Sequence, residues 1–253
     1  MHYGRDVIYL YDGSFDGLLN AVFDSYYNRE IPVAIESGEN IQEDLFCDIV
    51  TIVSDSDKAE RVYKSIKNKI SPAALENIYY TYLSDTLSKG RLCLDYIRAG
   101  YKFGKNVDMH VNIPCVTAVA DAVLRVKNES YQYLQFVRFS ELEGGVFYSE
   151  IEPKCNILSL IATHFENRLS NMPWMIHDIG RKICMVYNGK YCYLTPTDKI
   201  PSVKYSENEL LCRSLWKKFY NTIEIKERHN ERCRISHMPK RYWKHMTEFE
   251  VEK

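Results

Sequence analysis

Residues 7–26 read VIYLYDGSFDGLLNAVFDSY, and this stretch sets the class of fold. Its first five residues form a short apolar run rich in β-forming residue types, and the Asp-Gly-Ser that follows at residues 12–14 is a turn signal. From Phe15 to Tyr26 the apolar residues recur at steps of three and four, which is the spacing of one buried face of an α-helix. The stretch therefore predicts a strand, a tight turn and an amphipathic helix.

The turn at residues 12–14 has two interpretations. A helix that begins after a strand can seat an anion at its N-terminus. The aspartates at positions 12 and 16 would repel a phosphate, so a capped strand-to-helix turn is the favoured interpretation. Further strands are expected at residues 32–36 and 49–53, and a helix from Ser54, with Asp57 completing a capping box. This β-α-β-β-α order indicates a small α/β layer over residues 1–70.

Most of the middle of the chain has helical spacing. Ser71-Pro72 is a helix start, and residues 72–103 are expected to be almost wholly helical, with Gly90 and Gly104 at ends or breaks. Pro114 opens another long helix that runs through Phe136. These elements predict a helix-rich region after the first layer.

The pattern changes after residue 143. Asn188-Gly189 lies between two short β-type runs, which is the strongest short hairpin signal. The other elements expected here are a turn at 143–145, a strand at 146–151, a helix capped by Asn156, a strand at 174–179, a helix capped by Ser206 and Glu209, and a short helix at Lys240–Met246. The predicted fold class is α+β (mixed α/β), with a small N-terminal βαβ-type layer and then a helix-rich domain with a short antiparallel sheet or hairpin. The predicted domains are residues 1–84 and 85–253.

Charge is unevenly distributed along the chain. Residues 1–60 hold three Lys or Arg against thirteen Asp or Glu, a net charge of −10. The whole chain has a net charge of −1, so the remainder carries +9. An acidic N-terminal third joined to a basic remainder favours two surfaces with different partners, and nucleic acid suits the basic one. The alternative is that both are simply solvated faces.

The sequence lacks the signature motifs of several classes of protein. The eight cysteines contain no CxxC pair, so zinc ribbons, iron–sulfur clusters and thioredoxin-like redox sites are not indicated. There is no phosphate-binding GxxxxGK[ST], dinucleotide GxGxxG, HExxH or GxSxG motif. No membrane span or signal peptide is evident, and scattered cysteines then indicate reduced thiols and a cytoplasmic location. No metal or cofactor is expected.

The segment from Lys226 to His245 interleaves basic and aromatic residues. Delocalised cations suit phosphates, and flat rings suit unstacked bases, so the segment favours contact with nucleic acid. The expected phosphate contacts are Arg228, Arg241 and Lys244, and the expected stacking platform is Trp243. The alternative is a basic surface helix whose aromatic rings fold back into the core.

A second cluster spans residues 164–181. His164 and Arg168 are one helical turn apart, and a strand from Trp174 ends near Asp178. Three roles are open: His164 with Asp178 as a general acid and base, Arg168 with Arg181 as a phosphate clamp beside a stacking Trp174, or a structural Arg–Asp pair. The structural pair is favoured over catalysis, because nothing nearby supplies a nucleophile.

A divalent-metal site is a further alternative. Tyr148, Glu150, Glu152, His164 and Asp178 carry suitable ligand atoms. Glu150 and Glu152 lie two apart on one side of a strand, where such residues are commonly just solvated. The solvated strand is the favoured interpretation.

Several stretches resemble a known family. They are Ile8 to Leu19, Arg138-Phe139 with Tyr148 to Pro153, Ala162 to Arg168, Pro173 to Asp178, Trp216 to Tyr220, Ile225 to Asn230, and Met238 to Trp243 with Glu248 and Phe249. The chain resembles the bacterial "probable DNA metabolism protein" family, whose C-terminal domain is a domain of unknown function. The likeness covers nearly the whole chain and is most specific over about residues 85–250.

The resemblance implies a role in DNA repair. Genes of this family tend to lie beside one for a radical SAM protein thought to modify or repair DNA, and a similar C-terminal domain is fused elsewhere to an iron–sulfur uracil-DNA glycosylase. This chain lacks the radical SAM CxxxCxxC motif. We therefore expect an accessory DNA-binding protein that acts with a radical SAM partner. The alternatives are a glycosylase- or nuclease-like enzyme that uses His164, Asp178 and Arg168, and a protein-interaction module that never contacts DNA.

Overall fold

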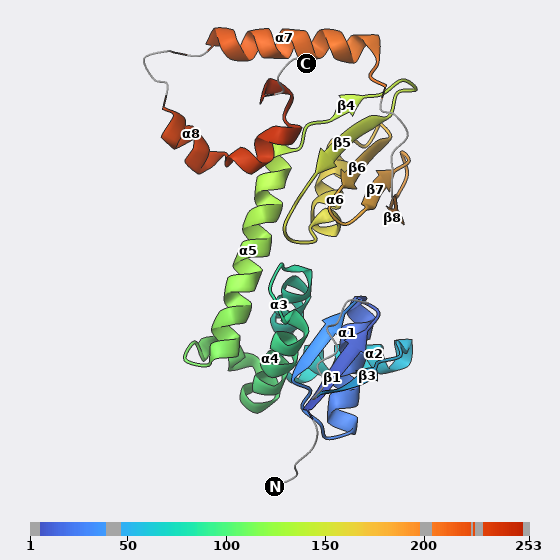
Figure 1. Cartoon of the computed structure of the whole chain (residues 1–253), viewed down its shortest axis with the longest axis vertical. Helices are drawn as coiled ribbons and strands as arrows, with labels where there is room; N and C mark the ends of the chain where they lie inside the picture. Colours follow the sequence, from blue (N-terminus) through green and yellow to red (C-terminus); the bar gives the residue numbers. More distant parts are fainter. Residues whose placement is uncertain (1–5, 39–46, 198–203, 224, 226–229, 250–253) are drawn as a thin grey trace. The chain divides into compact units, whose positions relative to one another are not determined.

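The structure is a computed structural model that describes residues 6–38, 47–197, 204–223, 225 and 230–249. The chain forms two compact units, Met1–Lys127 and Asn128–Lys253 (Figure 1). Both helices and strands occur in each unit, which confirms the predicted mixed α+β class. No single helix in the described ranges is long and apolar enough to cross a membrane. The bent pair Lys89–Met109 and Pro114–Phe136 meets that test by length and composition.

The N-terminal unit is a three-stranded parallel sheet with helices packed against it. The strand order is β2-β1-β3, and Ile8 of β1 is paired with both Ala34 and Ile49. The strands are β1 (Asp6–Tyr11), β2 (Ala34–Ser37) and β3 (Cys47–Thr51). The helices are α1 (Phe15–Tyr27), α2 (Ser56–Lys69), α3 (Pro72–Leu83), α4 (Lys89–Phe103), the 3₁₀ helix η1 (Gly104–Met109) and α5 (Pro114–Phe136), which runs on into the second unit. The β-α-β-β-α prediction is confirmed.

The turn between β1 and α1 is a capped turn, as favoured from the sequence. The Ser14 hydroxyl accepts a hydrogen bond from the Gly17 amide at 2.9 Å, so it caps α1. The Asp12 carboxylate accepts from the backbone and side chain of Ser14 and from the Ser54 hydroxyl. These hydrogen bonds hold the pKa of Asp12 below its usual value, and the one from the Ser14 side chain has the largest effect. Ser54 is thereby used in the turn, and Asp55 instead caps α2, which corrects the predicted capping box.

The long helical region is two helices. A break at residues 84–88 separates α3 from α4, and Gly104 ends α4 with a positive φ of 62°. Gly90 is the second residue of α4, beside the break, as expected from the sequence. A Cβ at this position would meet the Ile35 carbonyl oxygen at 2.3 Å, so this glycine lets α4 approach β2 closely. Helix α4 lies within the N-terminal unit, Met1–Lys127.

The C-terminal unit contains a five-stranded mixed sheet, larger than the short antiparallel sheet expected. The strand order is β4-β5-β6-β7-β8, and only β5 and β6 are parallel. The strands are β4 (Ser140–Glu141), β5 (Phe147–Ile151), β6 (Trp174–Asp178), β7 (Ile183–Tyr187) and β8 (Cys192–Pro196). The predicted hairpin at Asn188-Gly189 joins β7 to β8, and Gly189 has a φ of 90°.

Helices complete this unit. They are α6 (Leu158–Arg168), α7 (Glu207–Ile223), α8 (Glu231–His237) and the 3₁₀ helices η3 (Lys240–His245) and η4 (Thr247–Phe249). Helix α6 connects the parallel strands β5 and β6, and its Phe165 ring contacts the buried Trp174 of the sheet. The Ser206 hydroxyl accepts from the Glu209 amide at 3.0 Å, so the cap predicted for α7 is confirmed. Asn156 does not cap α6, where Ile157 holds the cap position.

Candidate nucleic-acid interface

The C-terminal unit has an open cleft of about 500 Å³ that three arginines line. Arg138 follows the end of α5, Arg168 is the last residue of α6, and Arg213 lies in the middle of α7. The side chains of Phe139 and Trp216 supply part of the remaining wall. We call this feature the arginine cleft. Guanidinium groups beside aromatic rings can hold a phosphate and an adjacent base.

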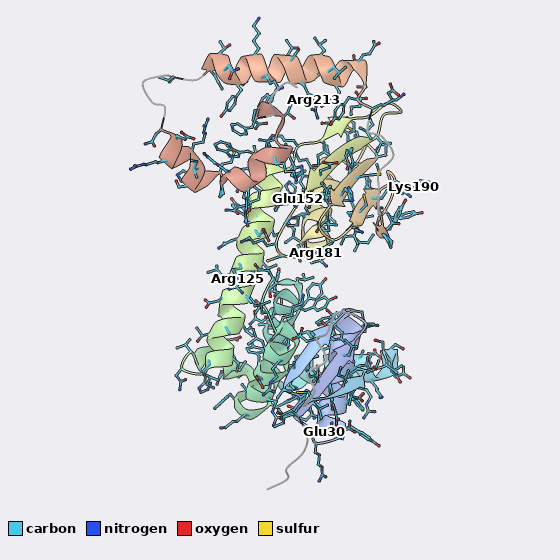
Figure 2. All side chains as sticks on the ribbon, viewed as in Figure 1. Glu30, Arg125, Glu152, Arg181, Lys190 and Arg213 are labelled. Atoms are coloured by element: carbon cyan, nitrogen blue, oxygen red, sulfur yellow. The ribbon has the colours of Figure 1, made fainter. Side chains whose placement is uncertain are left out.

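Arg213 is held in position by its neighbours. Its Nε donates to Glu209 Oε1 at 2.8 Å, and its Nη2 donates to Ser140 Oγ at 2.6 Å. The guanidinium also lies over the Tyr205 ring at 4.0 Å. These contacts fasten α7 to β4, and Figure 2 labels Arg213 beneath α7. Arg213 is therefore a fixed wall of the cleft whose charge is largely balanced by Glu209.

A second network orients Arg138 and Trp216. Arg138 Nη2 donates to Glu248 Oε1 at 2.9 Å, and the Trp216 indole Nε1 donates to Glu248 Oε2 at 3.3 Å. The Glu248 side chain is almost fully buried, so its two hydrogen bonds offset the cost of burying its charge. Trp216 is 42% exposed and stacks on Phe219 with ring centroids 5.7 Å apart. The indole is thus anchored at its nitrogen and leaves ring surface open to solvent.

Arg168 differs from the other two arginines. It is exposed and has no carboxylate partner among the residues that the structure describes. A cation without a partner retains its full attraction for an anion. Arg168 therefore gives the arginine cleft its positive character.

The predicted catalytic pair is not formed. Asp178 is fully buried and accepts from Arg181, from Nη1 at 2.9 Å and from the backbone amide at 3.1 Å. Arg181 also donates to the carbonyl oxygens of Pro153 and Lys154, so its guanidinium group is occupied. His164 is exposed on α6 and makes no hydrogen bond to Asp178 within the described ranges. The geometry supports the structural pair of Arg181 with Asp178. It does not support a phosphate clamp formed by Arg168 with Arg181.

Trp174 cannot serve as a stacking platform. Its side chain has no exposed surface and stacks on Tyr187 at 5.5 Å inside the core. A buried ring has no free face to offer a base, so this expected contact is corrected. The reason is that Trp174 begins the central strand β6, where its ring contacts the rings of Phe139, Phe165 and Tyr187.

The predicted cations of the last segment are paired with carboxylates. Arg241 contacts Glu129 at 3.2 Å, and Lys244 contacts Glu152 at 2.6 Å. Trp243 stacks on Phe249 at 4.5 Å, and its Nε1 donates to the Met238 carbonyl. The fourth predicted residue of this segment, Arg228, lies outside the described residues. The two ion pairs connect η3 to α5 and to Glu152, the residue that follows β5, so Arg241 and Lys244 both have structural partners.

A polar pocket of about 70 Å³ adjoins the arginine cleft and shares Arg138 and Arg213 with it. Its walls carry Tyr148, which donates to Glu150 Oε1 at 2.8 Å and lies 3.2 Å from His177 Nδ1. The buried Ser149 hydroxyl in the pocket wall has no partner in the described chain. The metal site considered from the sequence also combined Tyr148 with Glu150. Its other members were Glu152, His164 and Asp178, and His177 was not among them.

Burial and neighbouring charges shift the acid–base properties of this pocket. Burial lowers the pKa of His245, although Glu152 and Glu150 oppose the shift. Burial, followed by the hydrogen bond to Glu150, raises the pKa of Tyr148. The hydrogen bond from Lys244 lowers the pKa of Glu152. Among the residues with described positions, no group of three or more His, Cys, Asp or Glu side chains is arranged to hold a metal ion.

The comparisons with known proteins give one result. A family model described as a domain of unknown function, DUF4130, matches residues 88–248. That match covers more than half of the chain and includes the whole arginine cleft. No curated protein matches the chain.

Proposed function

Since this chain belongs to the family described as a domain of unknown function, DUF4130, its role has to be inferred from its own geometry, and we propose that it is an accessory DNA-binding protein. The observation that carries the proposal is the arginine cleft, in which three guanidinium groups surround one opening and Arg168 has no carboxylate partner among the described residues. Phosphate oxygens are the acceptors that a guanidinium fork matches best.

Each part of the cleft has a distinct role in this proposal. Arg168 supplies the uncompensated charge that attracts the DNA backbone. Arg138 and Arg213 are already oriented by Glu248 and Glu209, so they lose little side-chain entropy when a phosphate approaches. Trp216 takes the stacking role first expected of Trp174, because its ring is partly exposed at the cleft edge.

The setting of this function is also proposed. The chain acts in DNA repair or modification, in the cytoplasm, together with a radical SAM enzyme. The resemblance to the DNA metabolism family supports the pathway and the partner. The scattered spacing of the cysteines supports a reducing compartment.

A binding titration tests the proposal. We expect fluorescently labelled DNA to bind at about 50 mM salt and to lose affinity steeply at about 200 mM, because phosphate contacts release counterions. Arg168→Glu should weaken binding at least about tenfold and lower the salt slope by about one. Lys190→Glu is the matched control, since it makes the same change of charge at an exposed hairpin position. The proposal fails if both variants bind DNA equally.

A second candidate function is a protein-interaction module, and α7 favours it. Leu211 and Leu215 lie one turn apart on α7 and are 59% and 56% exposed. Such a stripe is unusual on a surface that contacts only water. Co-purification with the radical SAM partner, combined with no DNA shift by either protein alone or by the complex, would favour this candidate over DNA binding.

A further inference from the structure

The N-terminal unit has a groove of its own, about 800 Å³ in volume, formed by α1, α2 and α4. Its walls include Phe23, Tyr26 and Tyr27 from α1, Arg61 and Lys69 from α2, and Tyr101 from α4. We call it the tyrosine groove. It lies within a different compact unit from the arginine cleft and shares no residue with it.

The floor of the tyrosine groove is aromatic. Phe23 and Tyr27 are stacked with an interplanar angle of 14° and centroids 6.1 Å apart. Tyr26 meets Tyr101 edge to face at 5.7 Å. Tyr27 is 78% exposed, so the stack ends in a ring whose surface is open to solvent. An aromatic stack that ends at the surface can be extended by one more flat ring.

The rim of the groove is cationic. The Arg61 guanidinium lies 5.1 Å from the centroid of Phe23. Lys58 and Lys64 also border this region, but they are paired with Asp24 at 3.1 Å and Glu60 at 2.6 Å. Arg61 and Lys69 have no carboxylate partner in the described part of the chain. Two uncompensated positive charges therefore flank the open aromatic stack, although the first sixty residues as a whole are acidic.

This juxtaposition defines the chemistry of the occupant. An acidic peptide would use the cations and leave the ring face unused, whereas an apolar helix would leave the cations unused. A duplex hides the faces of its bases inside its own stack. A single strand offers both unstacked bases and phosphates, at a spacing that suits rings and cations side by side.

We propose that the tyrosine groove binds single-stranded nucleic acid, with a base stacked on Tyr27 and backbone phosphates at Arg61 and Lys69. This is a second nucleic-acid contact beyond the arginine cleft, and it does not depend on that cleft. Removing one stacking ring weakens single-strand binding by an amount equivalent to roughly 1–3 kcal/mol per base. A loss of about tenfold in affinity is therefore expected when Tyr27 is truncated.

The experiment measures the affinity of the full chain for a labelled oligothymidylate and, separately, for a blunt duplex. Tyr27→Ala should weaken oligothymidylate binding about tenfold and leave duplex binding unchanged, while Tyr27→Phe should retain wild-type affinity. Tyr131→Ala is the matched control, because Tyr131 is also highly exposed but lies outside the groove. Thermal unfolding of Tyr27→Ala should match that of wild type, since so exposed a ring adds little to the core.

The outcomes separate this proposal from the previous one. If Tyr27→Ala binds oligothymidylate as well as Tyr131→Ala does, the tyrosine groove is not a stacking site. If polyglutamate competes as well as oligothymidylate and Tyr27→Ala has no effect, the cations act alone and the proposal is also overturned. If Arg168→Glu has no effect while Tyr27→Ala does, the groove stands and the arginine cleft fails.

Discussion

The pair of Arg181 and Asp178 has a measurable structural role. Asp178 is fully buried, and Arg181 is the source of both of its hydrogen bonds in the described structure. Removing one partner of a buried ion pair leaves an uncompensated charge, which costs several kcal/mol. We expect Arg181→Ala to lower the free energy of unfolding by about 3 kcal/mol, measured by urea denaturation.

The double variant provides the control for this prediction. Arg181→Ala leaves the Asp178 carboxylate without its partner, and Asp178→Asn removes that charge. The two substitutions together should therefore lower the free energy of unfolding by less than the sum of their separate effects. Lys190→Ala, at an exposed position, should leave stability within about 0.5 kcal/mol of wild type. If Arg181→Ala is as stable as Lys190→Ala, then Arg181 is available for a ligand and our assignment of a structural role is wrong.

His245 makes the stability of the C-terminal unit depend on pH. Burial lowers its pKa below 6.5 in the folded chain, so the unfolded chain binds a proton first as the pH falls. The contribution of neutral His245 to the free energy of unfolding is present above pH 6.5. It is lost as the pH falls through the pKa that His245 has in the folded chain. The pKa of Glu152 is lowered chiefly by Lys244. Glu152 therefore stabilises the folded chain above pH 4.5, its usual pKa, and this stabilisation is lost at lower pH.

The pH ranges in which His245 and Glu152 lose their stabilising contributions can be separated experimentally. Urea unfolding between about pH 7.5 and pH 5.5 reports on His245 and not on Glu152. His245→Gln should flatten the fall in stability across this range. An unchanged fall in the variant would show that other groups carry it.

At the scale of elements, α7 is a helix whose apolar stripe is exposed. Leu211 and Leu215 project from it into solvent, while Arg213 and Glu209 attach its opposite side to β4 and its neighbours. We expect the double substitution Leu211→Glu with Leu215→Glu to change the free energy of unfolding by no more than about 0.5 kcal/mol. Leu158→Ala, at a fully buried position of α6, should cost about 2–5 kcal/mol and is the contrast.

This prediction fails if the double glutamate variant unfolds much more easily than wild type. The stripe would then be buried in the folded protein. If stability is kept but association with a protein partner is lost, the interaction-module candidate gains support.

Local patterns predicted the elements well, because their causes are local. The Asn188-Gly189 hairpin, the Ser206 cap and the long helix from Pro114 depend on residues within a few positions of one another. Gly90 was correctly expected beside a helix break, but its close approach to Ile35, which is distant in sequence, could not be predicted from a local pattern. The sequence correctly predicted a helix at α7, but the exposure of Leu211 and Leu215 could not be predicted, since periodicity does not say what covers a face.

The candidate site was harder to predict than the elements. Arg138, Arg168 and Arg213 come from three helices or their ends, and no spacing rule links them. Of the predicted DNA contacts that the structure describes, only Arg168 lies in the arginine cleft. The basic–aromatic segment was a misleading signal, because a charge count does not reveal that Glu129 and Glu152 pair with Arg241 and Lys244.

At the scale of the whole molecule, net charge is a poor guide to the binding surfaces. Residues 61–253 carry a net positive charge, but several of their cations, including Arg181, Arg241 and Lys244, are paired with carboxylates of the same range. The cations that remain without carboxylates, within the described ranges, include Arg168 in one unit and Arg61 and Lys69 in the other. We therefore expect two separate nucleic-acid contacts, one in each compact unit.

Cys212 tests the central claim most directly, because this exposed thiol lines the arginine cleft, whereas the exposed Cys233 lies outside it on α8. The alkylation rate of each thiol is measured by mass spectrometry with and without saturating DNA. DNA bound in the cleft should slow alkylation of Cys212 severalfold, leave Cys233 unaffected, and lose this protection as salt is raised. An unchanged rate at Cys212, or protection of Cys233 instead, would contradict the assignment of the arginine cleft as the DNA site.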